Sequence, residues 1–384
     1  MHVTLDTLSV RHFRNIAHLE LALPSDGIAL VGDNGQGKTN LLEAIAYLEL
    51  LRSMRGVRDR ELIRFGEQGF SIGATLRGTA VSHIVVGADA AGRKKASVDG
   101  VEATRLTDAL GALPCVGFSP ADVVLVAGAP GERRRYLDIA LALTSPRYLT
   151  ALRQYRAALA RRNAALRLAA RPQARSSSVA SWEPALAEHG ALLVGERRTW
   201  VEEAAPEFGR LCDAIGEQAP VRLSYDSPLA EAGDVRAALA DALARGRGHD
   251  VKRGLTHAGP HRDDLGITLG GRDLRVVGSA GQQRTAAIAL RFLEAATFRE
   301  RRGAQPVLLL DDPFAELDRD RASRVLGLLE EVSARWRGQV VLCVPREEEI
   351  PRAFTRLERW AVRAGCFERR ADAMTAAAKA LGAT

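Results

Sequence analysis

Residues 32–39 read Gly-Asp-Asn-Gly-Gln-Gly-Lys-Thr, which fits the pattern G-x-x-x-x-G-K-[ST] of a phosphate-binding P-loop. This motif constrains the fold, because such a loop connects a buried strand to the first turn of a helix. Its glycines let backbone N–H groups turn toward phosphates, while Lys38 reaches the β/γ oxygens and the Thr39 hydroxyl binds Mg²⁺. We therefore expect the nucleotide to contact Gly32, Asp33, Asn34, Gly35, Gln36, Gly37, Lys38, Thr39 and Asn40.

The residues on both sides of the motif have the patterns that a P-loop needs. Residues 28–31 are all apolar and lie between Gly27 and Gly32, as expected for a short buried strand. Residues 40–48 place apolar side chains at helical spacing and contain neither glycine nor proline. This order of strand, loop and helix argues against the alternative of a glycine-rich turn that binds nothing.

A second buried strand is predicted at residues 306–312, Pro-Val-Leu-Leu-Leu-Asp-Asp. Apolar residues followed by acids are typical of a parallel strand that carries a carboxylate at its carboxyl end, where α/β sheets bind ligands. We expect Asp311 to hold Mg²⁺ through a water molecule, with Thr39 as the other ligand. The alternative is a strand that simply ends in two solvated aspartates.

Residues 279–285, Ser-Ala-Gly-Gln-Gln-Arg-Thr, resemble the signature element of ATP-binding-cassette (ABC) ATPases. The resemblance implies that Ser279, Gly281 and Gln282 cap a nucleotide from the side opposite the P-loop, and that a second subunit supplies them. It also implies that Asp312 and Lys38 are the catalytic residues, with Asp312 where many ABC ATPases carry a water-orienting glutamate. The shorter carboxylate favours slow hydrolysis. Residues 315–318 resemble the D-loop, in which Asp318 contacts the partner subunit.

The chain also resembles the RecF family, bacterial recombination-repair ATPases whose ABC-type head is related to the SMC family. Besides the motifs above, the similar segments are residues 8–15 (Leu-Ser-Val-Arg-His-Phe-Arg-Asn), 118–122 (Phe-Ser-Pro-Ala-Asp), 134–138 (Arg-Arg-Tyr-Leu-Asp) and 259–265 (Gly-Pro-His-Arg-Asp-Asp-Leu). Residues 259–264 and 281–285 are much more specific than the P-loop, and the resemblance covers most of the chain. It implies that Arg14 and Asn15 lie near the nucleotide phosphates.

Two positions depart from these family patterns. Ala280 replaces a glutamine expected inside the signature, although Ser279 and Gly281 are kept. RecF-like chains usually carry a polar residue after the strand that follows the D-loop. Here residues 339–345, Gln-Val-Val-Leu-Cys-Val-Pro, place an apolar residue or cysteine at that position. This departure puts γ-phosphate sensing by the loop in doubt, but not nucleotide binding.

The region after the P-loop changes from a strand pattern to a helix pattern. Up to about residue 130 the chain alternates like short strands, for example at residues 82–86 and 96–99. Residues 133 to about 245 are then predicted to be helical. The polar run 171–178 predicts the turn of a short antiparallel coiled-coil hairpin. Its apolar residues at heptad spacing are Leu152, Leu159 and Leu166, with Tyr155 between them, and Leu186, Leu193 and Trp200.

The first half of this hairpin is strongly basic. Residues 139–182 contain eight arginines and no acidic residue. Contact with DNA phosphates is predicted for Arg153, Arg156, Arg161 and Arg162, which lie mainly off the apolar positions. The alternative is a solvated, arginine-rich helix, and the same alternative is stronger for a second cluster at residues 52–64. Because few aromatic residues accompany either cluster, we expect contacts to the DNA backbone with little sequence specificity.

Composition agrees with an intracellular protein that binds a polyanion. The 384 residues are 46% apolar, enough for one large core or two lobes, and carry a formal charge of +7. No apolar run approaches the roughly 20 residues of a membrane span, and charged residues interrupt any signal-peptide core at the N-terminus. The four cysteines lack C-x-x-C spacing. A metal site at His257, His261, Asp263 and Asp264 is not expected. We expect a cytoplasmic location.

Together these features predict an α/β fold: a P-loop ABC-type ATPase head with a β-rich lobe and an inserted helical lid, or short antiparallel coiled-coil arm. The expected parts are an N-terminal lobe at residues 1–132, the arm at 133–250, a C-terminal lobe at 251–365 and a flexible, alanine-rich tail at 366–384.

The predicted function is ATP-gated DNA binding in recombinational repair and replication restart. A homodimer that sandwiches ATP and Mg²⁺ would hold single-stranded, double-stranded or gapped DNA, and weak DNA-stimulated hydrolysis would release it. By resemblance, the partners would be the RecR and RecO proteins, and the chain would support recombinase loading and the SOS response.

Three alternatives remain at this point. A transporter nucleotide-binding subunit would lack the basic arm. A small-molecule P-loop kinase would leave the signature element unexplained. The third is a DNA clamp that binds ATP but scarcely hydrolyses it.

Overall fold

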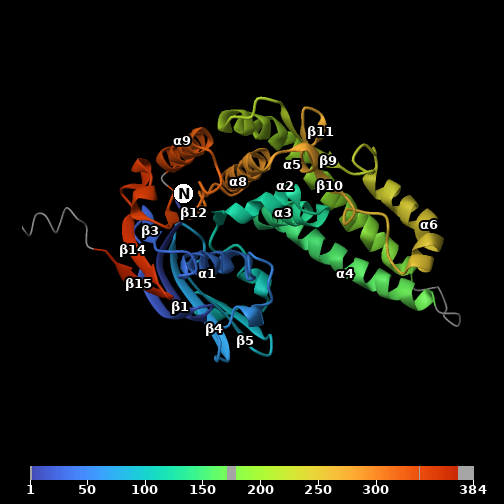
Figure 1. The fold of residues 1–384 in the computed structure, drawn as a ribbon. Helices are drawn as coiled ribbons and strands as arrows, with labels where there is room; N and C mark the ends of the chain where they lie inside the picture. The colour runs from blue at the N-terminus through green and yellow to red at the C-terminus, as the bar shows by residue number, and fades with distance from the viewer. Residues whose placement is uncertain (1, 171–178, 337, 371–384) are drawn as a thin grey trace, which may run out of the picture. The chain divides into compact units, whose positions relative to one another are not determined.

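A computed structural model describes residues 2–170, 179–336 and 338–370 of the chain (Figure 1). The chain divides into two compact units, and each is described by itself. The head unit comprises residues Met1–Ala121 and Glu294–Thr384, and the arm unit comprises Asp122–Leu293. The arm predicted at residues 133–250 falls inside the arm unit, together with the signature element.

A six-stranded sheet forms the centre of the head unit, in the order β15-β14-β3-β13-β12-β8. Its neighbouring strands run parallel, except for the antiparallel pair β14 and β15. The bounds are β3 Gly27–Val31, β8 Cys115–Phe118, β12 Val307–Asp311, β13 Val340–Val344, β14 Glu358–Arg363 and β15 Cys366–Arg369. Strands β3, β12 and β13 are almost entirely buried and apolar, as parallel strands covered on both faces are. The strands predicted at 28–31 and 306–312 are therefore confirmed.

A second, antiparallel sheet of the head unit has the order β2-β1-β4-β5-β6-β7. Its strands alternate buried and exposed residues, so one face packs on the core and the other meets water. The bounds are β1 Thr4–Phe13, β2 Ile16–Ala22, β4 Gly69–Arg77, β5 His83–Asp89, β6 Lys94–Val98 and β7 Val101–Glu102. Strands β5 and β6 confirm the strand pattern predicted at residues 82–86 and 96–99.

Helix α1, Lys38–Leu50, packs against both sheets of the head unit. It contacts β1 and β5 on one side and β8, β12 and β13 on the other, and one continuous hydrophobic core contains residues of all these elements. Phe13, Tyr47 and Phe70 meet edge to face inside this core. The other helical segments of the unit are α9 Arg319–Trp336, η1 Asp59–Glu61, η2 Leu106–Asp108, η6 Glu347–Glu349 and η7 Arg352–Phe354.

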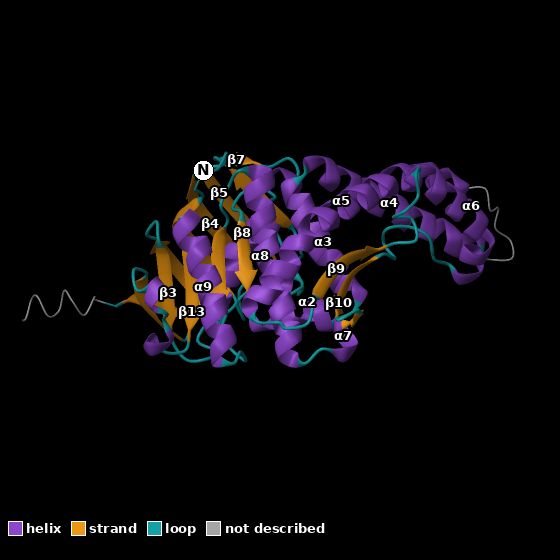
Figure 2. Cartoon of the chain, turned by 90° about the horizontal axis from the view of Figure 1, so that it is seen from above, coloured by secondary structure: helices purple, strands orange, loops and turns teal. Residues whose placement is uncertain are grey.

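The arm unit is built mainly from helices (Figure 2). Its helical segments are α2 Val124–Ala127, α3 Pro130–Thr144, α4 Pro146–Ala169, η5 Ala180–Trp182, α5 Glu183–Ile215, α6 Val235–Arg253 and α7 Leu274–Val277, while η3 Pro120–Val123 spans the boundary between the two units. A small antiparallel sheet of order β11-β10-β9 completes it, with β9 Val221–Asp226, β10 Asp264–Leu269 and β11 Arg272–Asp273. Helix α8, Ala280–Arg302, begins in this unit and ends in the head unit.

Helices α4 and α5 pack on each other, and their heptad residues Leu152, Tyr155, Leu166, Leu186, Leu193 and Trp200 are buried, whereas Leu159 is half-buried. The expected turn at 171–178 lies outside the described residues. Two features differ from the prediction. Strand β9 interrupts the region expected to be helical, and helix α6 packs against both α4 and α5. The arm is therefore a three-helix layer, because α6 buries Leu239 and Leu243 and covers a face that the heptad pattern left exposed.

Arg162 shows the consequence of this third helix. Its side chain is completely buried, and its guanidinium donates hydrogen bonds to Asp250 Oδ2 (2.7 Å), Thr256 Oγ1 (2.8 Å) and Glu183 Oε1 (3.0 Å). These partners belong to α6, to the loop after it and to the start of α5. The prediction that Arg162 contacts DNA is therefore wrong, since its guanidinium is buried and paired with carboxylates inside the arm.

Glu49, in the last turn of α1, is a buried carboxyl group of the head unit. Cys115 donates to it from both its backbone N–H (3.0 Å) and its Sγ (3.4 Å). Burial is the largest influence on its pKa and raises it; the Cys115 N–H lowers it and the charge of Glu294 raises it further, to about 8 overall. At neutral pH this group is therefore mostly protonated.

The C-terminal region begins with a strand. Residues 366–369, which were expected to belong to a flexible tail, form β15 and pair with β14. Residues 371–384 lie outside the described part of the chain. Among the described residues, no helix is both long enough and apolar enough to cross a membrane.

Replacing Arg162 by methionine should destabilise the arm unit by about 3–5 kcal/mol, because Asp250 and Glu183 would keep buried charges without their shared guanidinium. Urea unfolding followed by the fluorescence of Trp182 and Trp200 measures the effect. Arg153→Met, on the exposed side of the same helix, is the control and should change stability little. Equal effects of the two substitutions would show that the buried network does not stabilise the arm.

The raised pKa of Glu49 predicts a pH-dependent stability. The unfolded chain loses this proton near the ordinary value of 4.5, but the folded protein keeps it until about pH 8. Stability should therefore fall as pH rises between these values, by at most about 1.4 kcal/mol per pH unit. Glu49→Gln should flatten this decline, whereas the exposed control Glu102→Gln should not. Superimposable pH profiles for wild type and Glu49→Gln, measured by urea unfolding, would exclude this role.

Candidate functional site

The P-loop joins β3 to α1 with a backbone that requires glycine at two positions. Gly35 and Gly37 have φ values of 80° and 118°, in the left-handed region that other residues rarely adopt. A Cβ on Gly37 would also lie 2.8 Å from Oδ1 of Asn15. The motif glycines therefore serve both the turn and the close packing of the loop against the end of β1.

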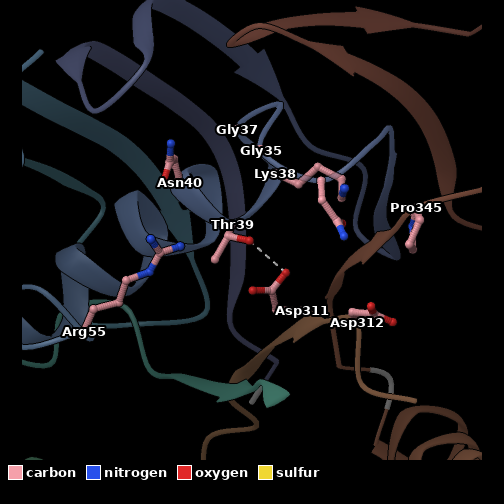
Figure 3. A pocket seen from close by; sticks show the side chains of 10 residues that line it. Gly35, Gly37, Lys38, Thr39, Asn40, Arg55, Asp311, Asp312 and Pro345 are labelled. Atoms are coloured by element: carbon pink, nitrogen blue, oxygen red, sulfur yellow. Dashed lines mark hydrogen bonds between the residues drawn. The ribbon is translucent and has the colours of Figure 1, made fainter. Parts of the chain in front are cut away.

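Lys38 and Thr39 form the first turn of α1 and face the loop. The Lys38 ammonium is nearly buried and donates to the carbonyl oxygens of Gly32 and Asp33, the latter at 3.0 Å. The Thr39 hydroxyl donates to Oδ1 of Asp311 at 3.0 Å, as the dashed line in Figure 3 shows. The structure thus brings together the three side chains that sequence analysis assigned to phosphate and Mg²⁺.

Asp311 ends strand β12 and is largely buried. Burial raises its pKa above the usual value, and the adjacent Asp312 adds to this, while the Thr39 hydrogen bond and the charges of Arg55 and Lys38 oppose it. A cation beside this carboxylate would stabilise its charged form. The hydroxyl of Thr39 and the carboxylate of Asp311 are the oxygen ligands that Mg²⁺ prefers, so these two residues fit a Mg²⁺ site.

These side chains line one pocket of the head unit (Figure 3). Its lining consists of Asn34, Gly35, Gly37, Lys38, Thr39, Asn40, Arg55, Asp311, Asp312 and Pro345. Asp312 has a positive φ of 46°, a backbone strain that is common at functional sites. Sequence analysis did not assign Arg55 to this site, because nothing in the spacing of an arginine cluster shows that one member faces the P-loop. Pro345, which follows β13, stands at the departure noted in the sequence.

Arg14 and Asn15 are not among the residues that line the pocket; they brace it. Asn15 donates to the carbonyl of Gln36 (3.1 Å) and accepts from the side chain of Asn40 (2.8 Å), so it ties the end of β1 to the P-loop and to the helix that follows it. Arg14 donates to Glu43 at 3.0 Å. The implied role of both residues close to the phosphates stays a prediction.

Glu43, which sequence reasoning missed, lies beside the pocket residue Arg55. It is completely buried in α1, accepts from Ser53 Oγ at 2.5 Å, and lies 3.8 Å from Arg55 Nε. A glutamate in a helix is ordinarily expected to face water, so no pattern in the sequence indicated this position. In the structure it links Arg14, Arg55 and Ser53 to the helix that starts at Lys38.

The signature residues belong to the arm unit and stand at the start of α8. Ser279 caps this helix: its Oγ accepts from the backbone N–H of Gln282 (3.3 Å), and the Gln282 side chain accepts from the N–H of Ser279 (3.0 Å). Ser279 is exposed, and Gly281 is partly exposed. The exposed N-terminus of a long helix has partial positive charge and free N–H groups, which suit an anion.

Asp318 precedes α9, and 61% of its side chain is exposed. Its Oδ1 accepts from the backbone N–H of Arg321 at 2.8 Å, so it caps that helix. The contact of Asp318 with a partner subunit stays a prediction.

The other arginines predicted to bind DNA differ in their surroundings. Arg153 is exposed on α4, and Arg161 is exposed and stacks over the ring of Trp182, 5.0 Å from its centre. Arg156 is paired with Asp138 at 2.7 Å, although 58% of the Arg156 side chain is exposed. Only Arg162, as described above, is withdrawn from solvent.

The histidines and aspartates of residues 257–264 have protein partners. His261 bonds Tyr155 Oη (2.6 Å) and the carbonyl of Thr256 (3.0 Å), and burial lowers its pKa to about 4. Asp264 is paired with Arg133 at 2.7 Å, and Asp263 accepts from Tyr225. His257 instead lies near His249 and Asp250, with candidate ligand atoms within 4.8 Å of one another. There Asp250 is already shared between His257 and Arg162.

Comparison with known proteins agrees with this architecture. The family profile "RecF/RecN/SMC N terminal domain" matches residues 4–362. The DNA replication and repair protein RecF of Roseiflexus castenholzii is 37% identical to this chain, and the alignment covers 95% of this chain and 99% of that protein. In Anaeromyxobacter dehalogenans the identity is 40%, over 86% and 90% of the two chains.

Solved structures show the same fold. A structure of the recombination mediator protein RecF-ATP in the RecFOR pathway superimposes with a TM-score of 0.87 at 29% identity, over 96% of this chain and 98% of that chain. The Smc head domain from Pyrococcus furiosus has a TM-score of 0.57 at 18% identity, over 99% of both chains, which supports a common fold only. The profile match, the RecF relatives and the shared head architecture establish that this chain belongs to the RecF family, with the ABC-type head fold that its motifs predicted.

Proposed function

We propose that the chain binds ATP with Mg²⁺ in the pocket between the P-loop and β12. The observation that carries this proposal is the hydrogen bond between Thr39 and Asp311, since it places both predicted Mg²⁺ ligands beside Lys38. Mg²⁺ in such a site neutralises phosphate charge. Lys38 would exchange its present carbonyl partners for phosphate oxygens, and the loop N–H groups would hold the remaining oxygens. The RecF relative described with ATP supports this assignment.

Hydrolysis is proposed to be slow and stimulated by DNA. Asp312 lines the pocket and would orient the attacking water, but its carboxylate is one methylene shorter than the glutamate of many ABC ATPases. Catalysis would depend on positioning and charge stabilisation, with Lys38 and Arg55 as the cationic groups at the site. The chain would therefore act mainly as a nucleotide-gated binding protein.

We also propose that a second copy of the chain completes the ATP-binding site. Ser279, Gly281 and Gln282 at the exposed start of α8 would cap the γ-phosphate of the partner's nucleotide, with Asp318 contacting the partner nearby. In this arrangement the binding energy of ATP becomes free energy of dimerisation. Hydrolysis would remove the shared ligand and open the dimer.

DNA is the proposed ligand of the closed dimer. The formal charge of +7 and the exposed Arg153 and Arg161 support a contact with phosphates, and the relatives are named as replication and repair proteins. Single-stranded, double-stranded and gapped DNA are proposed substrates, in recombinational repair and replication restart. RecR and RecO are proposed partners in recombinase loading and the SOS response, since the solved relative is described within the RecFOR pathway.

A pair of complementary variants tests the shared nucleotide site. Lys38→Met should abolish ATP binding and with it ATP-dependent dimers, while Ser279→Arg should keep ATP binding but not dimerise. A mixture should regain dimers, because one composite site then combines an intact P-loop with an intact signature. Sedimentation velocity with ATP and Mg²⁺ measures all three samples. Wild-type dimerisation of Lys38→Met, or loss of ATP binding in Ser279→Arg, would refute the assigned roles.

DNA binding is tested by fluorescence anisotropy on gapped duplex, with and without ATP and Mg²⁺, at 50 and 200 mM salt. We expect ATP to tighten binding at least about tenfold, and the added salt to weaken it by a similar factor or more, because several phosphate contacts release counterions. Lys38→Met should lose the effect of ATP but keep the dependence on salt. Absent binding would leave a nucleotide-binding protein whose substrate is not DNA, and binding that is indifferent to ATP would refute the proposed gating.

A further inference from the structure

Phe65 is the most exposed large apolar side chain among the residues that the structure describes. Its relative exposure is 101%, compared with 73% for Val276 and 71% for Val101. A phenylalanine of a folded protein normally buries most of its ring, because each exposed ring costs hydrophobic free energy. An aromatic ring held entirely in water therefore requires an explanation.

The backbone around Phe65 keeps the ring exposed. The N–H of Glu67 bonds the carbonyl of Arg64 at 3.0 Å, so residues 64–67 form a β-turn with Phe65 in its second position. Gly66 has a φ of 87°, the left-handed value that the third position of a type II turn needs. The turn is thus built to present Phe65 at its tip.

This turn is attached to the core of the head unit. The N–H of Arg64 bonds the carbonyl of His12 (2.8 Å), and the N–H of Arg14 bonds the carbonyl of Leu62 (2.7 Å). Leu62 and Phe13, between these bonds, are completely buried. The chain is thus bonded to β1 just before the turn, and two residues after the turn it enters β4, which also pairs with β1. Because the turn is fixed in this way, little ordering entropy would be lost when Phe65 binds a partner.

The chain leading to Phe65 is positively charged. Residues 52–64 contain five arginines and two acidic residues. One of the acids, Asp59, is already bonded to Lys94 (2.8 Å) and to Tyr47 (2.9 Å). Arg58 and Arg60 are exposed. A single aromatic ring among cations fits a nucleobase on a phosphate backbone; a protein interface would instead need neighbouring apolar side chains.

We propose that Phe65 stacks on the base pair that ends a duplex, at the junction between double-stranded and single-stranded DNA, while the exposed Arg58 and Arg60 hold the adjacent phosphates. Inside a continuous duplex both faces of every base are covered by neighbours. At a gap or an end one face is open, and a rigid ring can cover it. This inference rests on the proposed binding of gapped DNA and adds the side chain that would recognise the gap.

The same backbone connects Phe65 to the nucleotide pocket. Arg14 is bonded through its main chain to Leu62, next to the turn, and through its guanidinium to Glu43 of α1 at 3.0 Å. Asn15 follows at once and bonds both Gln36 and Asn40 of the P-loop segment. A rearrangement of the P-loop around ATP would thus reach Leu62, three residues before Phe65, through Asn15 and Arg14, so junction binding should respond to ATP.

The test compares Phe65→Ala with the matched control Val101→Ala, which removes another exposed apolar side chain of the head unit. The probe is a gapped duplex with 2-aminopurine in the terminal base pair, and the reference is a duplex closed at both ends by hairpins. Phe65→Ala should bind the gapped probe about tenfold more weakly, with an unchanged salt slope, and should bind the closed duplex as wild type does. Phe65→Trp should restore junction affinity, and its indole fluorescence should be quenched on binding.

Several outcomes would overturn this proposal. Unchanged affinity of Phe65→Ala for the gapped probe would exclude stacking while leaving the proposed DNA binding intact. Equal losses on gapped and closed duplex would show that Phe65 does not read the junction. Loss of ATP-dependent dimers in Phe65→Ala without DNA would assign the ring to a contact between copies of the chain. A wild-type protein that binds no DNA would refute the proposed function and this inference with it.

Discussion

The nucleotide pocket depends on the parallel pairing of β3, β13 and β12. Strand β13 lies between the other two and pairs Val344 with Val31 and Cys343 with Asp311. Parallel strands open at the same edge of a sheet, so the P-loop after β3 and the carboxylate that ends β12 must meet there. This pairing brings Thr39 and Asp311, 272 positions apart, within hydrogen-bonding distance. All three strands are almost entirely buried on both faces, and the hydrophobic effect therefore holds them inside the head unit.

The second sheet of the head unit supports the P-loop through strand β1. Gln339, which precedes β13, bonds the N–H (2.8 Å) and the carbonyl (3.0 Å) of Leu5 in β1, so the two sheets are tied together by a buried amide. At its other end β1 runs into Asn15, which holds the P-loop in the space left open by Gly37. The short stretch of backbone at Arg14 and Asn15 thereby connects the nucleotide pocket, β1 and the exposed turn at Phe65. This arrangement gives a physical route by which DNA and ATP could influence each other's binding.

Buried ionisable groups account for several of the differences between expectation and structure. Arg162 was assigned to DNA because it lies off the heptad positions of α4, yet α6 covers it and supplies Asp250 as its partner. Glu43 and Glu49 were not singled out at all, because polar residues within a helix ordinarily face water. Each of these groups is stabilised by a partner distant in sequence, such as Arg14 for Glu43 and Cys115 for Glu49. Local patterns carry no information about such partners.

The sequence by itself determined the P-loop, its flanking strand and helix, the acidic strand that ends at Asp311, and the apolar residues of α4 and α5. These features follow from local rules: glycines where the backbone turns, apolar runs where a strand is buried, and heptad spacing where helices pack. Only the tertiary structure decided that Arg55 faces the pocket, that Arg162 is buried by a third helix, and that Phe65 is held in water. Exposure and pairing are properties of the space around a side chain, and that space is created by segments far away along the chain.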